Sequence, residues 1–516
     1  MTLMRGKERA IADAMSRLTH VNPFLPDRIA IEKDVLGSRF VATREVWNVD
    51  TELGGLNANL APIDVAVRQL LPTMRERLSQ AEPASDEELA LYEDLVLYAL
   101  YAEYAPVWFE AMERDEDGRA RKVPAYDRFA ADVASYFELP GLGSTARRDP
   151  AFLFAYGYQT RRAFHHVFRQ IFGASLPAAK LRASVWQSIF SHDRSRYRRV
   201  LYDRMHDFTT LITGESGTGK ELVARAIGFS RFIPFDPDTR TFAEGFTRGF
   251  HPLNLSALSP TLIESELFGH KKGAFTGAVD DREGWLEVCG VGGTVFLDEV
   301  GELDPEIQVK LLRVLQSRTF QRLGETRERR FEGKIIAATN RDLGEEMQGG
   351  AFRQDFYYRL CSDRIHTPSL RDQLADHPGD LHNLVLVIAR RLFGRDEADA
   401  VAGQVEGWIH AELGNVYTWP GNIRELEQCI RNVVIRGSYQ VPTATGAVAA
   451  AGVRGELAAA TAAGQLDMEE LGVRYATLLY HQTGSYEEAA RRLGLDRRTV
   501  KARVDAKLLE RLSSEG

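Results

Sequence analysis

The sequence predicts a protein of several domains whose central part is a doubly wound α/β domain. Residues 214–220 read GESGTGK, a glycine-rich loop of the form G-x-x-x-x-G-K. It follows an apolar, β-branched segment (209–213) and precedes a strongly helix-forming one (221–227). Strand and helix signals alternate over residues 176–437, as in doubly wound sheets. The regions on either side of this central part look mainly helical.

Strand, glycine-rich loop and helix, in this order, form the context that a phosphate-binding loop requires. The loop N–H groups and the helix N-terminus would face phosphates, and Lys220 would reach the β- and γ-phosphates of ATP. A chance glycine turn is the alternative, and it leaves the second motif downstream unexplained. The generic loop has Ser or Thr after the lysine to contact Mg²⁺, but here Glu221 follows, so Mg²⁺ would rely on other ligands and water. The expected ATP-binding residues of the loop are Gly214, Glu215, Ser216, Gly217, Thr218, Gly219, Lys220 and Glu221.

The second motif is GTVFLDE (293–299), an apolar strand that ends in two carboxylates. Asp298 is suited to hold Mg²⁺, and Glu299 is suited to orient and polarise an attacking water. An acidic pair after a strand is a weak signal alone. Downstream of a phosphate loop it predicts an ATPase.

Composition sets the bounds. The chain has 516 residues, 44% hydrophobic content and a net charge of −8, which predicts three or so domains of ordinary globular composition. We find no apolar run long enough for a membrane span and no signal-peptide pattern. Because three widely spaced cysteines (Cys289, Cys361 and Cys429) match no metal site, we expect reduced thiols in a cytoplasmic protein. With an acidic net charge, any DNA contact must come from a local patch.

Residues 1–175 are expected to form a mainly helical domain of unknown type. Ser85 and Glu88 form a possible capping box before a long helix, which Pro106 should interrupt. The region lacks the alternating strands with acidic ends of a phospho-receiver domain.

Two groups of side chains in this region could suggest a ligand site. Tyr101, Tyr104 and Trp108 fall on one helical face, where we favour a packed aromatic core over a ligand box. The pair His165 and His166 fits surface or core positions better than metal ligands.

The loop GAFTGA (273–278) has an apolar residue between two glycines. The glycines allow backbone conformations that other residues resist, so Phe275 would stand on an exposed tip. An exposed apolar tip is costly unless a partner covers it. The alternative is a buried turn.

Residues 438–467 are rich in Ala, Gly and Thr and are expected to be a linker. Residues 468–516 are expected to form a helix-turn-helix of the Fis type, with helices at Met468–His481, Tyr486–Leu493 and Arg497–Leu508. Gly494 marks the turn and Asp496 the N-cap of the last helix. Residues with the spacing that packs two helices at a steep angle are Ala489, Ala490, Leu493, Leu495, Val500 and Val504.

The basic side chains of this region concentrate in the last helix, as expected of a recognition helix in the major groove of DNA. A helical hairpin with a solvated basic face is the alternative. The expected DNA-binding residues are Arg497, Arg498, Thr499, Lys501, Arg503 and Lys507.

Longer segments carry a specific resemblance. SALSPTLIESELFGHKKGAFTGAVDDREGWLEVCGVGGTVFLDEVGELDPEIQVKLLRVLQ, together with IIAATNRDL, FRQDFYYRL and WPGNIRELEQ, resembles the bacterial enhancer-binding proteins. These are AAA+ activators of RNA polymerase that carries the alternative sigma factor sigma-54. The resemblance covers residues 176–437 and the C-terminal domain. It implies an AAA+ ATPase domain with a helical lid, a ring that is expected to be a hexamer, and double-stranded DNA and sigma-54 RNA polymerase as partners.

The resemblance also implies roles for single residues. Asn254 would restrain the catalytic Glu299, Thr339 and Asn340 would sense the γ-phosphate, and Arg424 would be a second sensor in the lid. An acidic residue at Glu221 is itself typical of the family. Arg353 and Arg359 would reach the ATP of a neighbouring subunit. The sigma-54 contact would be made by Gly273, Ala274, Phe275, Thr276, Gly277 and Ala278.

The sequence departs from the family pattern at residues 191–208 and 232–251, which look like insertions, and only loosely follows it at 367–381. We therefore predict a sigma-54-dependent transcriptional activator whose N-terminal domain controls assembly or hydrolysis. The main alternative is a DNA-binding regulator that uses the AAA+ fold mainly to oligomerise, independently of sigma-54. An AAA+ remodeller unrelated to transcription is a third possibility, which the DNA-binding end disfavours.

Overall fold

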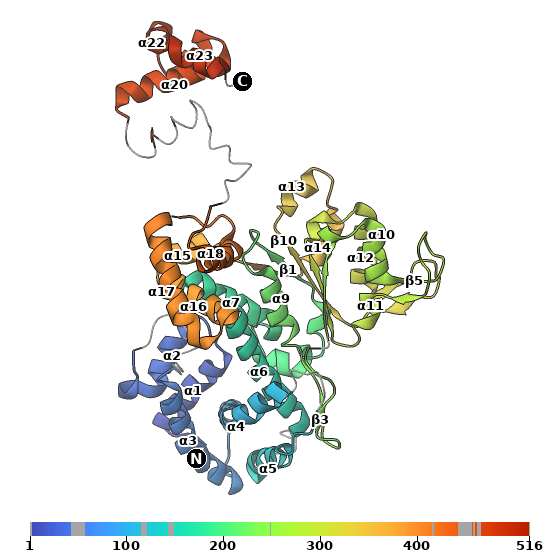
Figure 1. The fold of residues 1–516 in the computed structure, drawn as a ribbon. Helices are drawn as coiled ribbons and strands as arrows, with labels where there is room; N and C mark the ends of the chain where they lie inside the picture. The colour runs from blue at the N-terminus through green and yellow to red at the C-terminus, as the bar shows by residue number, and fades with distance from the viewer. Residues whose placement is uncertain are drawn as a thin grey trace. The chain divides into compact units, whose positions relative to one another are not determined.

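The computed structural model describes residues 3–42, 57–114, 121–142, 149–247, 249–414, 417–441, 457, 460–461 and 466–514. These fold as two compact units, Met1–Gly437 and Ser438–Gly516 (Figure 1). The boundary expected near residue 175 lies inside the first unit. Most of the expected linker lies outside the described residues.

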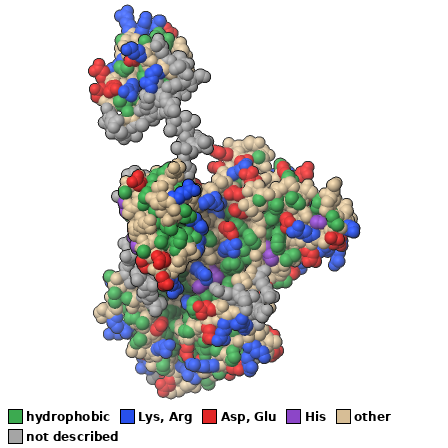
Figure 2. All heavy atoms as spheres, viewed as in Figure 1, with side chains coloured by type: hydrophobic (Ala, Val, Ile, Leu, Met, Phe, Trp, Pro, Cys, Tyr) green, Lys and Arg blue, Asp and Glu red, His purple; other side chains and the backbone are tan. Residues whose placement is uncertain are grey.

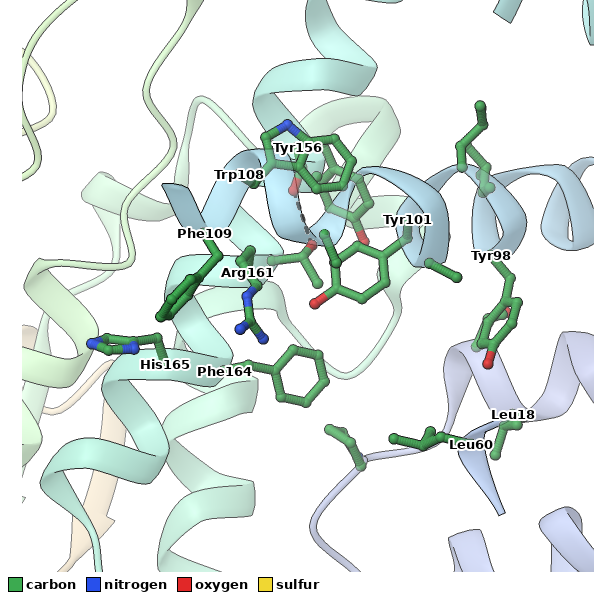
Figure 3. Close-up of a pocket in the computed structure, with 18 of the residues that line it drawn as sticks. Leu18, Leu60, Tyr98, Tyr101, Trp108, Phe109, Tyr156, Arg161, Phe164 and His165 are labelled. Atoms are coloured by element: carbon green, nitrogen blue, oxygen red, sulfur yellow. Dashed lines mark hydrogen bonds between the residues drawn. The ribbon is translucent and has the colours of Figure 1, made fainter. Parts of the chain in front are cut away.

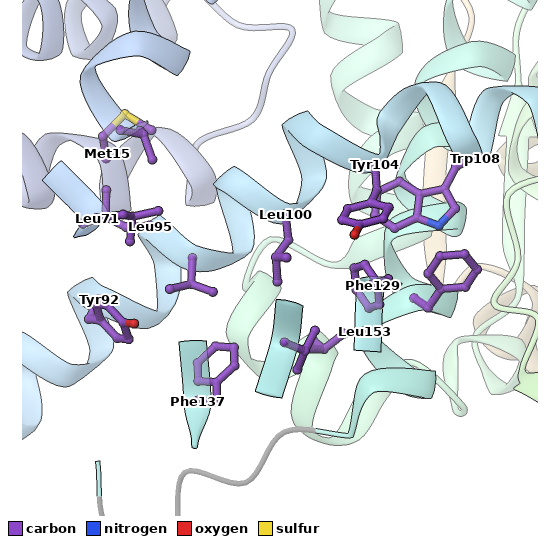
Figure 4. Packing of buried hydrophobic residues seen from close by; sticks show 14 of the residues in the cluster. Met15, Leu71, Tyr92, Leu95, Leu100, Tyr104, Trp108, Phe129, Phe137 and Leu153 are labelled. Atoms are coloured by element: carbon purple, nitrogen blue, oxygen red, sulfur yellow. The ribbon is translucent and has the colours of Figure 1, made fainter. Parts of the chain in front are cut away.

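The first unit begins with helices that share one buried cluster (Figure 4). The long helix α4 starts with the expected capping box, in which Ser85 N donates to Glu88 Oε2 at 3.1 Å and Glu88 N donates to Ser85 Oγ at 3.2 Å. The expected interruption at Pro106 is wrong, because α4 continues through it. Tyr104 and Trp108, on either side of the proline, are both buried, and this burial offsets the hydrogen bond that proline cannot make. The helices of this cluster are α1 (Lys7–His20), α2 (Asp27–Leu36), α3 (Leu60–Ser79), α4 (Asp86–Arg114), α5 (Tyr126–Phe137) and α6 (Pro150–Gln170). The next helix, α7 (Leu176–Phe190), belongs to another buried cluster.

A five-stranded parallel sheet follows in the same unit, in the order β11-β1-β10-β7-β4. Alternate residues of the strands face opposite buried clusters: Leu211 and Val295 on one side, Ile212 and Phe296 on the other. Both faces are covered, so the predicted doubly wound α/β fold is confirmed. The strands are β1 (Thr210–Thr213), β4 (Phe250–Asn254), β7 (Thr294–Asp298), β10 (Lys334–Thr339) and β11 (Asp363–His366).

Helices cover the sheet and continue into a helical lid. On one face lie α7 and α9 (Lys220–Gly228). The other face is covered by α10 (Pro260–Phe268), α12 (Pro305–Ser317) and α14 (Gln354–Leu360), and the short α11 (Trp285–Val288) and α13 (Leu343–Gln348) lie on the same side. The lid comprises α15 (Leu370–Asp376), α16 (Asp380–Phe393), α17 (Arg395–Trp408) and α18 (Asn422–Arg436).

The expected insertion at 232–251 joins the helices to the sheet. It forms a hairpin of β2 (Phe235–Asp236) and β3 (Thr241–Phe242). Phe235 and Phe242 belong to the same cluster as Trp108, and the ring of Phe154 in α6 lies 4.8 Å from that of Phe235. From this hairpin the chain runs into β4, which ends at Asn254.

The expected insertion at 191–208 contains α8 (Arg194–Arg196) and a following π-helical turn (Tyr197–Leu201). Arg194 Nε donates to the Tyr156 hydroxyl at 2.9 Å. Tyr197 is buried and donates to Gln159 Oε1 at 2.8 Å. Arg194 and Tyr197 of this stretch therefore bind side chains of α6.

The second unit contains α20 (Met468–Thr483), α21 (Tyr486–Leu493), α22 (Arg497–Arg503) and α23 (Ala506–Ser514). The expected packing residues form its buried cluster with Leu479 and Tyr486. The helix expected over Arg497–Leu508 is wrong in extent, because it ends at Arg503. Asp505 accepts from Lys507 N at 2.8 Å and Leu508 N at 3.0 Å, so it caps a new helix instead of continuing the old one.

Over the described residues, no helix combines the length and apolar character needed to cross a membrane. The three cysteines are free thiols, and burial raises the pKa of Cys289 and of Cys429 to about 12. The described residues contain no His, Cys, Asp and Glu cluster fit for a metal ion. His166 is buried, and burial lowers its pKa well below the usual value, so it stays neutral.

Candidate nucleotide site and recognition surfaces

The phosphate loop connects β1 to α9 with three glycines in the left-handed backbone region or near it. Gly217 and Gly219 have φ of 79° and 88°. A Cβ on Gly214 would lie 2.1 Å from Thr367 Oγ1, and one on Gly217 would lie 2.3 Å from the Gly421 carbonyl oxygen. Glycine is therefore required both by conformation and by close approach.

Lys220 stands at the start of α9 with its side chain turned into this loop. Its Nζ donates to the carbonyls of Gly214 at 3.0 Å and Glu215 at 3.1 Å. Burial lowers the pKa of Lys220, while the negative charges of Glu299 and Asp298 oppose that shift. The lysine and both carboxylates therefore act on one another across the carboxyl ends of β1 and β7, between which β10 lies.

The acidic pair lies at the carboxyl end of β7, next to the ends of β10 and β4. Burial and the adjacent Glu299 raise the pKa of Asp298, which Lys220 opposes. Glu299 has a left-handed backbone with φ of 58°, a strained conformation that gathers at functional sites. Its Oε2 accepts from Asn340 N at 3.2 Å. Thr339, the last residue of β10, is fully buried, and its Oγ1 accepts from Arg341 N.

Asn254 and Glu221, two of the residues expected at the nucleotide site, form hydrogen bonds with neighbouring residues in the chain. Asn254 lies opposite Asp298 in the sheet register. Its Oδ1 accepts from Ser256 N at 3.0 Å and Ser256 Oγ at 2.8 Å, whereas the Glu299 carboxylate accepts from Asn340 N. Glu221 accepts from Arg225 Nε at 3.0 Å.

The lid reaches the phosphate loop through the first turn of α18. Arg424 donates to Ser216 Oγ at 3.0 Å. Asn422 is fully buried and donates from Nδ2 to Glu215 Oε2 at 3.0 Å and to the Ser216 carbonyl at 3.1 Å, while its Oδ1 accepts from Leu370 N. One asparagine thus joins the loop to two lid helices.

Sequence reasoning missed both Asn422 and Thr367. Thr367 Oγ1 lies 2.7 Å from Thr218 Oγ1 inside the loop. Asn422 stands in the WPGNIRELEQ segment, two residues before the expected sensor Arg424, so its position was a usable signal. Thr367 follows a short strand with no motif and carries no comparable signal.

The two expected arginine fingers lie on α14 or at its start, and both are exposed. Arg353 is paired with Asp355, with Nη2 2.7 Å from Oδ2. The Arg359 guanidinium has no hydrogen-bond or ion-pair partner in the part of the chain that the structure describes. The Arg359 carbonyl accepts from Thr209 Oγ1 at 2.9 Å, at the start of β1. The phosphate loop begins at the other end of β1. At the rise of an extended strand, the chain from Thr209 to Gly214 spans about 16 Å.

The GAFTGA loop lies between β5 (Gly269–His270) and β6 (Arg282–Glu283), which pair antiparallel. Lys272 N and Lys271 Nζ both donate to Asp281, closing the base of the loop. The expected exposed tip is wrong for Phe275, which is half-buried. Its ring meets the His270 ring edge-on at 5.0 Å, and this contact shields part of the apolar surface.

The basic residues of the second unit divide between its helices. Arg498 and Lys501 are exposed on α22, and Lys and Arg side chains gather over the part of this unit where α22 lies (Figure 2). Arg497 Nη1 pairs with Glu487 Oε1 at 3.2 Å. Arg503 is half-buried and lies close to Gly472 of α20. Lys507 is placed on α23, so its expected place in the recognition helix is wrong.

Residues 192–366 match the family model of the sigma-54 interaction domain. The hydrogenase transcriptional regulatory protein HoxA of Bradyrhizobium diazoefficiens is 45% identical over 230 residues, covering 45% of this chain and 43% of that protein. The transcriptional regulatory protein ZraR of Klebsiella oxytoca is 40% identical over 307 residues, covering 58% of this chain and 63% of that protein. The chain thus spans 43–63% of the length of these two relatives. A crystal structure of NtrX from Brucella abortus aligns with a TM-score of 0.39 at 22% identity, covering 69% of this chain and 73% of that chain.

Proposed function

Since this chain carries a sigma-54 interaction domain and is related to the bacterial enhancer-binding proteins, we propose that it is an ATP-driven activator of sigma-54 RNA polymerase. One observation carries the proposal. The same α/β domain combines a phosphate loop that α18 contacts, an acidic pair at the end of β7 and the GAFTGA loop between β5 and β6. The alternative, an AAA+ fold that serves mainly for oligomerisation, assigns no role to the strained backbone of Glu299 or to the GAFTGA loop.

In this proposal ATP binds at the loop that contains Lys220, and Glu299 orients the attacking water. Asp298 would hold Mg²⁺, because its burial beside a second carboxylate suits a divalent cation, and the ion would offset phosphate charge. Asn422 and Arg424 would report nucleotide occupancy to the lid. Hydrolysis would move the GAFTGA loop against sigma-54 and remodel the closed promoter complex.

The experiment that tests this function is transcription in vitro from a sigma-54 promoter with purified polymerase. We expect open complexes that require both this chain and ATP hydrolysis. Equal yields with ATP and with a non-hydrolysable analogue would contradict the proposal.

Arg359 is proposed to act on the ATP of a neighbouring subunit in a ring, expected to be a hexamer. The separation of Arg359 from its own phosphate loop supports this. Arg359→Ala and Glu299→Gln should each lower ATP hydrolysis strongly, since an arginine finger contributes about 10³–10⁵-fold. When the two variants are mixed, interfaces that combine the intact Glu299 of one subunit with the intact Arg359 of the next should regain hydrolysis.

The measurement is steady-state phosphate release across mixing ratios. Arg330→Ala, which removes another exposed arginine, serves as the control and should stay near wild type. Hydrolysis that never rises above the sum of the two separate variants would rule out action between subunits.

The second unit is proposed to bind an upstream DNA site through α22. Replacing Arg498 and Lys501 by Ala should abolish specific binding in a mobility-shift assay and leave ATP hydrolysis intact. Each lost phosphate contact should also reduce the salt dependence of binding by about one unit of slope. Arg474→Ala with Arg511→Ala removes the same charge from α20 and α23 and should bind nearly normally. Unchanged affinity in the α22 variant would place DNA reading on another surface.

The N-terminal helices are proposed to control hydrolysis through the β2–β3 hairpin. Phe235 and Phe242 pack among the rings of Tyr158 and Phe154, with Tyr158 3.9 Å from Phe242. The same hairpin leads into β4 and Asn254. A rearrangement of the N-terminal helices would therefore shift this hairpin and, through it, β4 and Asn254 at the nucleotide site.

A further inference from the structure

A large cavity lies among the N-terminal helices, apart from the nucleotide site (Figure 3). Its volume is about 1030 Å³, at the upper end of the range of about 300–1,000 Å³ for small-molecule sites. Aromatic rings from α4 and α6 form much of its wall, among them Tyr101, Phe109 and Phe164. A well-packed helical core leaves no such space, so the cavity needs an explanation other than the aromatic packing expected from the sequence.

The wall of the cavity is electropositive. Six arginines line it, against two acidic residues, Glu32 and Asp64. Both acids are already engaged: Glu32 pairs with Arg28 at 3.0 Å, and Asp64 accepts from the Tyr98 hydroxyl at 2.7 Å. Arg198 pairs with Asp94 outside the lining at 3.5 Å. The lining therefore offers no further carboxylate to its other arginines.

Arg161 is one of these lining arginines. Its guanidinium lies 4.8 Å from the centroid of the Phe109 ring, and its buried Nε has no hydrogen-bond partner among the described residues. Burial lowers the pKa of the nearby His165 to about 4, helped by the positive charges of Arg169 and Arg161. His165 is thus neutral at physiological pH and can accept or donate a hydrogen bond without adding charge. Figure 3 shows Arg161 between Phe109 and Phe164, with His165 beside them.

We propose that this cavity binds a small molecule with an aromatic body and one anionic group, such as an aromatic carboxylate or sulfonate, whose anion is held by Arg161. The rings supply contact area for the body, and the guanidinium of Arg161, which lines the cavity, supplies the cationic anchor. A neutral aromatic compound would leave the positive charge of Arg161 without an anion in the cavity.

The cavity also touches the parts of the molecule that govern the nucleotide site. Val387 of α16 and Arg395 of α17 line it, and both helices pack on α18, which carries Asn422 and Arg424. Arg194, in the segment leading to β1, lines it as well. A ligand that fills the cavity would therefore stabilise one arrangement of the lid and alter ATP hydrolysis.

Fluorescence titration of the full chain with anilinonaphthalene sulfonate tests the site, because this probe combines an aromatic body with one anionic group. We expect saturable binding of one molecule per chain. Arg161→Met should weaken it by about tenfold or more, as loss of a buried charged hydrogen bond predicts. Phenylnaphthylamine, which lacks the sulfonate, should bind weakly and equally to wild type and Arg161→Met. Arg128→Met removes an exposed arginine and is the matched control.

Ala105→Phe places a ring in the cavity and should abolish binding of both compounds, with folding checked by thermal unfolding. If that variant fails to fold, Arg161→Met still decides. Equal sulfonate affinity in wild type and Arg161→Met, or binding at several sites, would overturn the proposal. Saturating probe should also change ATP hydrolysis several-fold in wild type, and unchanged hydrolysis would overturn the link to the lid. Binding itself needs neither ATP turnover nor sigma-54, so its failure is distinguishable from failure of the proposed function.

Discussion

Glu299→Gln is expected to retain ATP binding and to lower steady-state ATP hydrolysis by about 10²–10⁴-fold, the usual contribution of a positioned general base. Gln keeps the size of the side chain and can still accept the hydrogen bond from Asn340 N. It loses the negative charge that polarises the attacking water. The same charge counteracts the effect of burial, which lowers the pKa of Lys220. Single-turnover hydrolysis and equilibrium binding of a fluorescent ATP analogue separate the two effects.

Two controls sharpen this prediction. Lys220→Ala should weaken nucleotide binding itself, because the lysine occupies the centre of the phosphate loop. Glu306→Gln makes the same chemical change at an exposed position in the first turn of α12 and should leave turnover near wild type. If Glu299→Gln hydrolyses ATP at the wild-type rate, Glu299 is not the catalytic base.

Phe275→Ala is expected to abolish open-complex formation by sigma-54 polymerase while basal ATP hydrolysis and DNA binding stay near normal. The ring is half-buried against His270 and belongs to none of the main buried clusters. Its loss should therefore cost the fold little. What it removes is the apolar contact surface of the GAFTGA loop.

The measurements are promoter melting by permanganate footprinting, ATP hydrolysis and thermal unfolding of the same protein. Val279→Ala, directly after the GAFTGA residues and 70% exposed, is the matched control and should retain most activity. Open complexes at wild-type yield would show that Phe275 does not couple hydrolysis to sigma-54. A large drop in unfolding temperature would instead make Phe275 a structural residue packed on His270.

How far the sequence predicts this protein depends on the range of the interactions involved. The GESGTGK loop, the strand ending in Asp298 and the Ala489–Val504 packing pattern are local, because chain neighbours within one or two elements determine them. Each of them lies in the structure in the element that the sequence predicts. The parallel sheet followed from the alternation of strand and helix signals.

Errors arose where a tertiary contact competed with a local preference. Pro106 stays helical because Tyr104 and Trp108 are buried around it. Helix α22 stops at Arg503 because Asp505 caps the next helix, while the Asp505 N–H donates to Thr477 Oγ1 at 2.9 Å. Neither the ring packing around Pro106 nor the contact with Thr477 can be read from neighbouring residues.

The sequence alone was therefore enough to locate four local motifs: the phosphate loop, the acidic pair, the GAFTGA loop and the basic helix. The contacts between these motifs and distant parts of the chain became visible in the tertiary structure alone. It brought Asn422 and Thr367 onto the phosphate loop and put Arg359 beside the start of β1. It also packed the 232–251 hairpin on the rings of α6 and left a separate arginine-lined cavity among the N-terminal helices. The reason is physical: local patterns set backbone conformation, whereas contacts between distant residues arise only when side chains fill a shared interior.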